Sequence, residues 1–91
     1  MKSYHTHHIL VKYKYEADDV LRKLAEGTPF QDIAKKISTC SSAAAGGDLG
    51  AIPLGKADAD FEEAALLLAP GEITKKPIRS RFGFHIIQRI S

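Results

Sequence analysis

Residues 82–90 read FGFHIIQRI, and this closing stretch carries the strongest fold signal in the chain. Its side chains alternate between the two faces of an extended strand. One face carries Phe84, Ile86, Gln88 and Ile90, and the other carries His85, Ile87 and Arg89. The stretch predicts a strand, and we expect it to lie beside the strand at the other end of the chain in one sheet.

The opposite end of the chain predicts that second strand. Residues 4–12 are rich in β-branched and aromatic side chains, as strands are. Alternation places His8 and Leu10 on one face, and His7, Ile9 and Val11 on the other.

Three apolar stripes at helical spacing fill the region between these strands. The members are Ala17, Val20, Leu21 and Leu24 in the first, Phe30, Ile33, Ala34 and Ile37 in the second, and Phe61, Ala64, Ala65 and Leu68 in the third. Gly27 is expected to end the first helix. Thr28 is expected to cap the second, with Pro29 at its first helical position. Asp58 or Asp60 can cap the third.

Two further strands complete the expected order. Residues 48–53 predict a short strand that bears Leu49 and Ile52, and residues 77–80 predict another. The small residues 38–47, which lie between the second helix and the strand at 48–53, predict a loop. The order β-α-α-β-α-β-β indicates an α+β fold, and 91 residues fit a single domain over residues 1–91.

The composition and charge of the chain exclude several classes of function. No apolar run approaches the ~20 residues that cross a bilayer. The first fifteen residues do not resemble a signal peptide, so we expect a cytoplasmic protein, unless the chain is a module of a larger exported one. The single cysteine, Cys40, has no partner for an internal disulfide. A net charge of +2 is too weak to indicate nucleic-acid binding, although residues 75–81 are basic.

Four stretches together resemble the parvulin family of peptidyl-prolyl cis/trans isomerases. They are HHILVKY (7–13), GTPFQDIAKKISTCSS (27–42), GGDLGAIPLGK (46–56) and FGFHIIQRI (82–90). They span most of the chain and follow the family's order. The resemblance implies a four-stranded, mainly antiparallel sheet surrounded by helices, and catalysis of X–Pro bond rotation.

The resemblance also implies a set of site residues. Those implied for catalysis are His8, Cys40, Ser80 and His85, and those implied for the proline pocket are Leu49, Ile52, Ala57, Phe61 and Phe82. Ala57 departs from the pattern, because many members carry a Met there that closes the pocket. The substitution should widen the pocket.

Other roles for these residues stay open. The two paired histidines could be structural, each bonded to the other or to a hydroxyl. Cys40 beside histidines could act as a nucleophile, although prolyl isomerisation needs no covalent intermediate. His5 and His7 share a strand face and could ligate a metal, but no carboxylate or cysteine lies close to them in sequence. We expect neither a metal nor a cofactor.

The expected partners are proline-containing peptides and unfolded or partly folded proteins, bound by a monomer, with no membrane or nucleic acid involved. Phosphate-directed parvulins carry a basic cluster after the first strand. Here the corresponding loop, residues 13–16, is short. Lys12 and Lys14 are the only two cations near it, and the acidic residues Glu16, Asp18 and Asp19 follow closely. The sequence therefore predicts an isomerase that is not phosphate-specific. The alternative is a non-catalytic peptide-binding or chaperone module that uses the same groove.

Overall fold

The computed structural model describes residues 2–91 and contains one four-stranded antiparallel sheet. The elements in chain order are β1 (Ser3–Val11), α1 (Lys14–Ala25), α2 (Phe30–Ile37), the 3₁₀ turn η1 (Ser41–Ala45), β2 (Asp48–Pro53), α3 (Ala59–Leu67), β3 (Ile78–Ser80) and β4 (Gly83–Arg89). The strand order is β2-β1-β4-β3. The predicted α+β class, the order of elements and the pairing of the two terminal strands are all confirmed.

The central strands β1 and β4 bring the two ends of the chain together. Their register places His8 opposite Ile87 and Leu10 opposite His85. Since side chains alternate along a strand, His8 and His85 emerge on the same face of the sheet. This register positions the candidate site.

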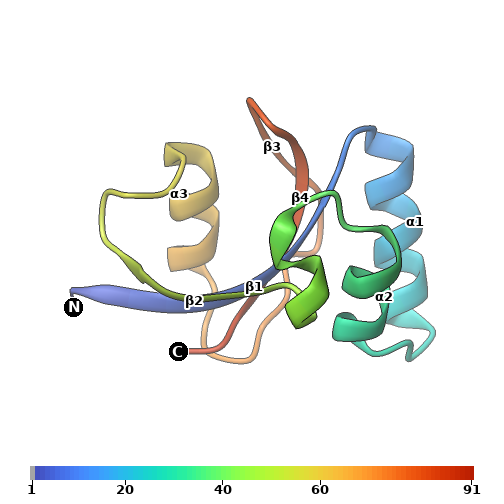
Figure 1. Cartoon of the computed structure of the whole chain (residues 1–91), viewed down its shortest axis with the longest axis horizontal. Coiled ribbons are helices and arrows are strands. Elements are labelled where there is room, and N and C mark those ends of the chain that lie inside the picture. The colour runs from blue at the N-terminus through green and yellow to red at the C-terminus, as the bar shows by residue number, and fades with distance from the viewer. Residues whose placement is uncertain (1) are drawn as a thin grey trace.

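Helices α1 and α2 cover one face of the sheet, on the right in Figure 1. The buried side chains between them and the strands are Ile9, Val11, Ala17, Val20, Phe30, Ile33, Ala34 and Ile86. The first two apolar stripes therefore lie where the sequence predicted. This layer anchors the centre of the sheet.

Helix α3 packs on the opposite face, on the left in Figure 1. Its buried contacts with the sheet form a second cluster of Tyr4, Phe61, Ala65 and Ile87. Asp58 caps the helix by accepting a hydrogen bond from the backbone N–H of Asp60 at 3.0 Å, which confirms one of the two expected caps. The site described below lies on this second face.

The expected cap of α2 was wrong by one residue. Helix α2 begins at Phe30 with Pro29 in the extended conformation before it, so Pro29 occupies the cap position and not the first turn. Thr28 belongs instead to the end of α1, because its backbone N–H donates to the carbonyl of Lys23 at 3.0 Å. Together with Gly27, which has a φ of +98°, this bond closes the C-terminal end of α1.

Two expected loops contain regular structure. Residues 13–16 are mostly the first turn of α1, which starts at Lys14. The segment 38–47 contains η1, whose cap residue is Cys40. Short 3₁₀ turns are frequent in connecting segments, and the small side chains of this segment gave no periodic signal.

Gly47 fixes the position of that segment against the sheet. Its carbonyl accepts the backbone N–H of His8 at 2.9 Å, and its φ is +90°. A Cβ atom at this position would lie 2.4 Å from the carbonyl oxygen of His8. Only glycine allows both the close approach and this backbone angle.

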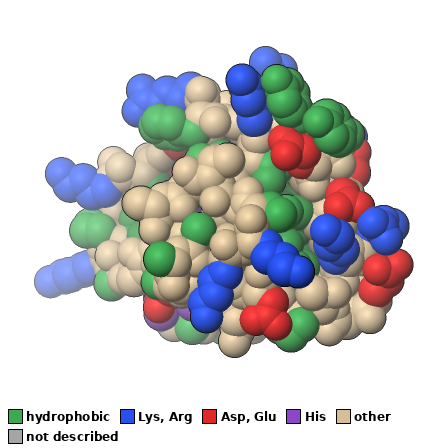
Figure 2. Space-filling view, turned by 45° about the vertical axis from the view of Figure 1, so that its right-hand side comes forward, with side chains coloured by type: hydrophobic (Ala, Val, Ile, Leu, Met, Phe, Trp, Pro, Cys, Tyr) green, Lys and Arg blue, Asp and Glu red, His purple; other side chains and the backbone are tan. Residues whose placement is uncertain are grey.

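The surface of α1 has mixed charge. Ion pairs join Lys14 to Asp18 at 3.0 Å and Lys23 to Asp19 at 3.2 Å, and Arg22 contacts Asp19 as well. Figure 2 shows basic and acidic side chains interspersed on the side that α1 covers. Exposed pairs of this kind contribute little stability. Among residues 2–91, no helix is long and apolar enough to cross a membrane.

Candidate active site

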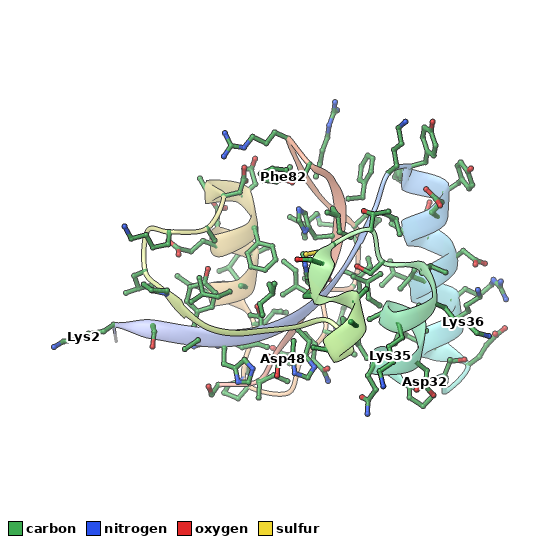
Figure 3. All side chains as sticks on the ribbon, in the orientation of Figure 1. Lys2, Asp32, Lys35, Lys36, Asp48 and Phe82 are labelled. Atoms are coloured by element: carbon green, nitrogen blue, oxygen red, sulfur yellow. The ribbon has the colours of Figure 1, made fainter. Side chains whose placement is uncertain are left out.

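An apolar pocket of about 360 Å³ opens between the sheet, α3, the turn η1 and the β3–β4 turn. Its lining residues are His8, Leu10, Cys40, Leu49, Ile52, Ala57, Asp58, Phe61, Phe82 and His85. Figure 3 shows Phe82 at the turn between β3 and β4, on the side of the sheet that carries α3. The structure thus brings together eight of the nine expected site residues, and the ninth, Ser80, lies immediately behind His85.

The two histidines form a buried pair. His8 Nδ1 lies 3.0 Å from His85 Nδ1, and the two rings stack with a 21° angle between their planes. Each side chain is about 4% exposed. In a neutral pair, one Nδ1 donates to the other, so the bond requires that at least one Nδ1 carries no proton.

Ser80 extends this pair into a chain of hydrogen bonds. Its Oγ lies 2.6 Å from His85 Nε2 and accepts the backbone N–H of Phe82 at 3.1 Å. If the Ser80 hydroxyl donates to His85 Nε2, then His85 Nδ1 donates to His8 Nδ1. The Ser80 hydroxyl and both Nδ1 atoms then each have a hydrogen-bond partner. His8 Nε2 then carries the remaining proton, and it has no hydrogen-bond partner among the described residues.

Burial makes protonation of the pair unfavourable. It lowers the pKa of His8 from the ordinary value of 6.5 to about 4, with a smaller contribution from the neighbouring His85. Burial also lowers the pKa of His85, against the attraction of the Asp58 carboxylate. Both rings are therefore neutral at pH 7.

Phe61 joins the apolar wall to the histidines. Its ring meets His8 edge-on at a centroid distance of 5.6 Å and His85 at 5.2 Å. The ring is about 4% exposed and belongs to the same buried cluster as Tyr4 and Ile87. Such edge-to-face contacts hold the aromatic planes in fixed orientations.

The two sides of the pocket differ in exposure. Leu49 and Ile52 of β2 and Ala57 before α3 are half-buried, whereas Phe82 is 59% exposed. The guanidinium of Arg81 lies 5.0 Å from the centre of the Phe82 ring. The pocket thus has a fixed apolar wall and one exposed aromatic edge.

Cys40 enters the pocket from the cap of η1. Its carbonyl accepts the backbone N–H of Ala43 at 2.9 Å, and its own N–H donates to Ser38 Oγ at 3.4 Å. These bonds fix the backbone of Cys40 while its side chain lines the pocket. Cys40 is partly exposed, so a ligand bound in the pocket can reach it.

The sequence-based list missed two pocket residues. Leu10 shares a strand face with His8, so its alternation was the available signal. Asp58 was identified as a helix cap only, and its side chain also lies 4.0 Å from Arg81 Nε. No local pattern distinguishes a capping aspartate from one that also borders a pocket.

A three-layer α+β fold with an apolar pocket over two buried histidines defines the class of prolyl isomerases of the parvulin type. The chain belongs to the rotamase family of PPIC-type PPIase domains, whose model matches residues 5–91. The resemblance to parvulins that the sequence indicated, and the expected class of enzyme, peptidyl-prolyl cis/trans isomerase, are both confirmed.

Curated relatives include foldases and chaperones. The chain is 45% identical over 83 residues to the foldase protein PrsA of Bacillus subtilis (strain 168), with 90% of this chain and 28% of that protein covered. It is 42% identical over 90 residues to the chaperone SurA of Ralstonia nicotianae, with 89% and 18% covered. The chain therefore matches less than a third of the length of either relative.

Solved structures include a small parvulin of similar length. The solution structure of NmPin, the parvuline of Nitrosopumilus maritimus, matches with a TM-score of 0.86 and 39% identity, covering 100% of this chain and 98% of that one. The crystal structure of PrsA from Bacillus subtilis matches with a TM-score of 0.93 and 41% identity, covering 99% and 35%. The fold of this chain is thus found both alone and inside longer proteins.

Proposed function

We propose that this site accelerates cis/trans rotation of X–Pro bonds in peptides and in unfolded or partly folded proteins, without a covalent intermediate. The observation that carries the proposal is the apolar pocket whose wall includes the stacked His8–His85 pair, with Cys40 beside it. Family membership and the foldase relatives support the same activity.

The reaction needs an apolar site with a few polar groups. Rotation about an X–Pro bond is slow because amide resonance must be lost, across a barrier of about 18–20 kcal/mol. Resonance places partial charges on the carbonyl oxygen and the nitrogen, and an apolar surrounding disfavours that planar, charge-separated state. Phe61, Leu49 and Ile52 would hold the ring of the proline while the preceding carbonyl turns.

The polar residues have separate roles in this proposal. The neutral pair of His8 and His85, fixed by Ser80, orients the groups that surround the twisted amide. Cys40 contributes a polar, polarisable sulfur on the loop side of the pocket. Bond rotation makes and breaks no σ bond, so no proton has to leave any of these groups.

A peptide assay tests the proposal directly. We expect catalytic amounts of the protein to accelerate cis-to-trans relaxation of short X–Pro peptides, followed after a solvent jump by NMR or absorbance. Binding of the same peptides with no acceleration would instead establish the alternative, a non-catalytic chaperone module. The small Ala57 in the pocket and the relative named a chaperone favour that alternative.

The same peptide series tests phosphate preference. We expect a phosphoserine-proline peptide to react no faster than its unmodified twin, because Lys14 is paired with Asp18 at 3.0 Å and Lys12 lies over the Tyr13 ring. These two cations do not form the cluster that grips a phosphate. A tenfold advantage for the phosphorylated peptide, about 1.4 kcal/mol, would contradict this prediction.

Cys40 offers a test of mechanism. If its role is electrostatic, Cys40→Ala should lower kcat/KM about tenfold, while Cys40→Asp stays within about threefold of the parent, because a polar group remains beside the substrate. Peptide assays on both variants measure this. Equal losses in the two variants would remove the electrostatic role, and a covalent adduct found by mass spectrometry would establish a nucleophile.

Three wider assignments stay predictions. Sedimentation would test the expected monomer, and limited proteolysis the single domain over residues 1–91. The cytoplasmic location predicted from the first fifteen residues is tested by fractionating the source cells. The curated relatives carry this domain within much longer chains, so the location of the whole protein depends on what else its chain contains.

A further inference from the structure

Two histidines and an aspartate meet on the sheet face opposite the pocket. His5 Nε2 lies 2.6 Å from Asp48 Oδ1, and His7 Nε2 lies 3.8 Å from Asp48 Oδ2. One ligand atom from each residue lies within 4.8 Å of the other two. Neither the pocket nor the proposed isomerisation uses any of these three side chains.

We propose that His5, His7 and Asp48 form a binding site for a divalent transition-metal ion of the zinc class. Two imidazole nitrogens and one carboxylate oxygen are the donors that Zn²⁺ and its neighbours accept, whereas Mg²⁺ and Ca²⁺ prefer oxygen ligands alone. Zinc–ligand bonds of about 2.0–2.2 Å place tetrahedral donors roughly 3.4 Å apart. The observed separations, 2.6 Å from His5 Nε2 to Oδ1 and 3.8 Å from His7 Nε2 to Oδ2 of the same carboxylate, lie on either side of that value.

The backbone holds the three donors on two paired strands. His5 and His7 are two residues apart on β1 and therefore share a face. His7 lies directly opposite Asp48 on β2, and the register shifts by a bulge between His5 and His7. The bulge lets both rings reach one carboxylate.

The carboxylate is also positioned before any ion binds. Asp48 Oδ1 accepts the backbone N–H of Gly50 at 2.8 Å. The hydrogen bonds from His5 and Gly50 both end on Oδ1, so Oδ2 is turned towards His7, from which it lies 3.8 Å away. An ion bound by both residues would replace the hydrogen bond between His5 Nε2 and Asp48 Oδ1.

The surroundings indicate a site of moderate strength with an open coordination position. His5 and Asp48 are 31% and 39% exposed, so an ion can enter and water can fill the fourth position. The ring of His7 packs against Phe30 at a centroid distance of 6.4 Å, but its Nδ1 has no hydrogen-bond partner among the described residues. A missing outer partner of this kind weakens binding about 10–100-fold relative to a site in which both histidines are held by outer hydrogen bonds.

Metal binding would tie together the two strands that also carry the pocket. On β1, His7 of the metal site precedes His8 of the pocket, and on β2 Asp48 precedes Leu49. Figure 3 shows Asp48 where β2 begins, well away from Phe82 at the other end of the view. An ion bound only to the folded chain raises its stability by mass action.

The test is a Zn²⁺ titration of the protein after treatment with a chelator. We expect one ion per chain by calorimetry, a rise in melting temperature, and movement of the NMR signals of the His5 and His7 rings. Asp48→Asn should weaken binding at least tenfold while keeping the oxygen that accepts from Gly50. The matched control Asp19→Asn removes an exposed carboxylate on α1 and should leave Zn²⁺ binding unchanged, and Mg²⁺ should cause no shift.

Three results would overturn the site. The first is Zn²⁺ binding of parental affinity in Asp48→Asn and in His5→Gln. The second is a titration in which the rings of His8 and His85 move and those of His5 and His7 do not, since the ion would then lie in the pocket with Cys40. A parental titration that shows no binding at millimolar Zn²⁺ overturns it as well.

Discussion

Phe61→Ala should lower kcat/KM for prolyl peptides by about tenfold or more, which corresponds to at least ~1.4 kcal/mol of transition-state stabilisation. The Phe61 ring lines the pocket and meets both histidine rings edge-on, at 5.6 and 5.2 Å. Its removal takes away the apolar wall for the proline ring and also frees the orientation of His8 and His85. A relaxation assay on the purified variant measures the loss.

The same substitution should destabilise the fold by about 3 kcal/mol, because Phe61 is almost fully buried against Tyr4 and Ile87. Phe30→Ala is the matched control, since Phe30 is equally buried but packs on the other face of the sheet. It should cost similar stability and leave the activity of the folded fraction unchanged. Phe61→Leu supplies a second pocket variant if Phe61→Ala does not fold.

These variants separate the pocket from the core. Folded Phe61→Ala that isomerises peptides at the parental rate would refute the assignment of this pocket. An equal loss of activity in Phe30→Ala would show that the effect comes from general loosening of the sheet.

Periodicity was sufficient to predict the layers of the fold. The alternation around His85 and Ile87 placed both on one face of β4, and the stripe that includes Ile33 predicted α2 and its buried side, although only the structure shows which face of the sheet α2 covers. These signals are local, because burial of one face imposes its period on consecutive residues. The ends of elements were less predictable, since Thr28 forms part of the C-terminal turn of α1 and does not cap α2.

Resemblance to a family, and not periodicity, identified the residues of the candidate site. Nothing local links His8 to Ser80, because their connection passes through His85 and depends on strand pairing. The same limit explains why no third ligand for a metal at His5 and His7 could be found from the sequence. Asp48 lies 43 residues beyond His5 and reaches it only through the pairing of β1 with β2.

Acid should weaken this protein through its histidine pair. The pKa of His8 is about 4 in the fold and 6.5 when unfolded, so at pH values between these limits the unfolded chain binds a proton that the folded chain excludes. Stability from this group is complete above pH 6.5 and is lost as the pH falls towards 4. Each unit of pKa difference between the folded and unfolded chain is worth about 1.4 kcal/mol, so the free energy of unfolding should fall by about 3 kcal/mol in total. The lowered pKa of His85 acts in the same direction.

Urea unfolding at pH 7, 5.5 and 4.5, in the presence of EDTA, measures this loss. His8→Asn keeps a polar group beside His85 but removes one titrating ring, so its stability should fall less steeply than that of the parent over the same range. The difference between the two curves isolates His8 from Asp48, whose lowered pKa affects stability only at more acidic pH. Parallel curves for parent and variant would mean that His8 accepts its proton in the folded protein as readily as in water, and the pair could not then be the neutral, buried unit on which the proposed mechanism depends.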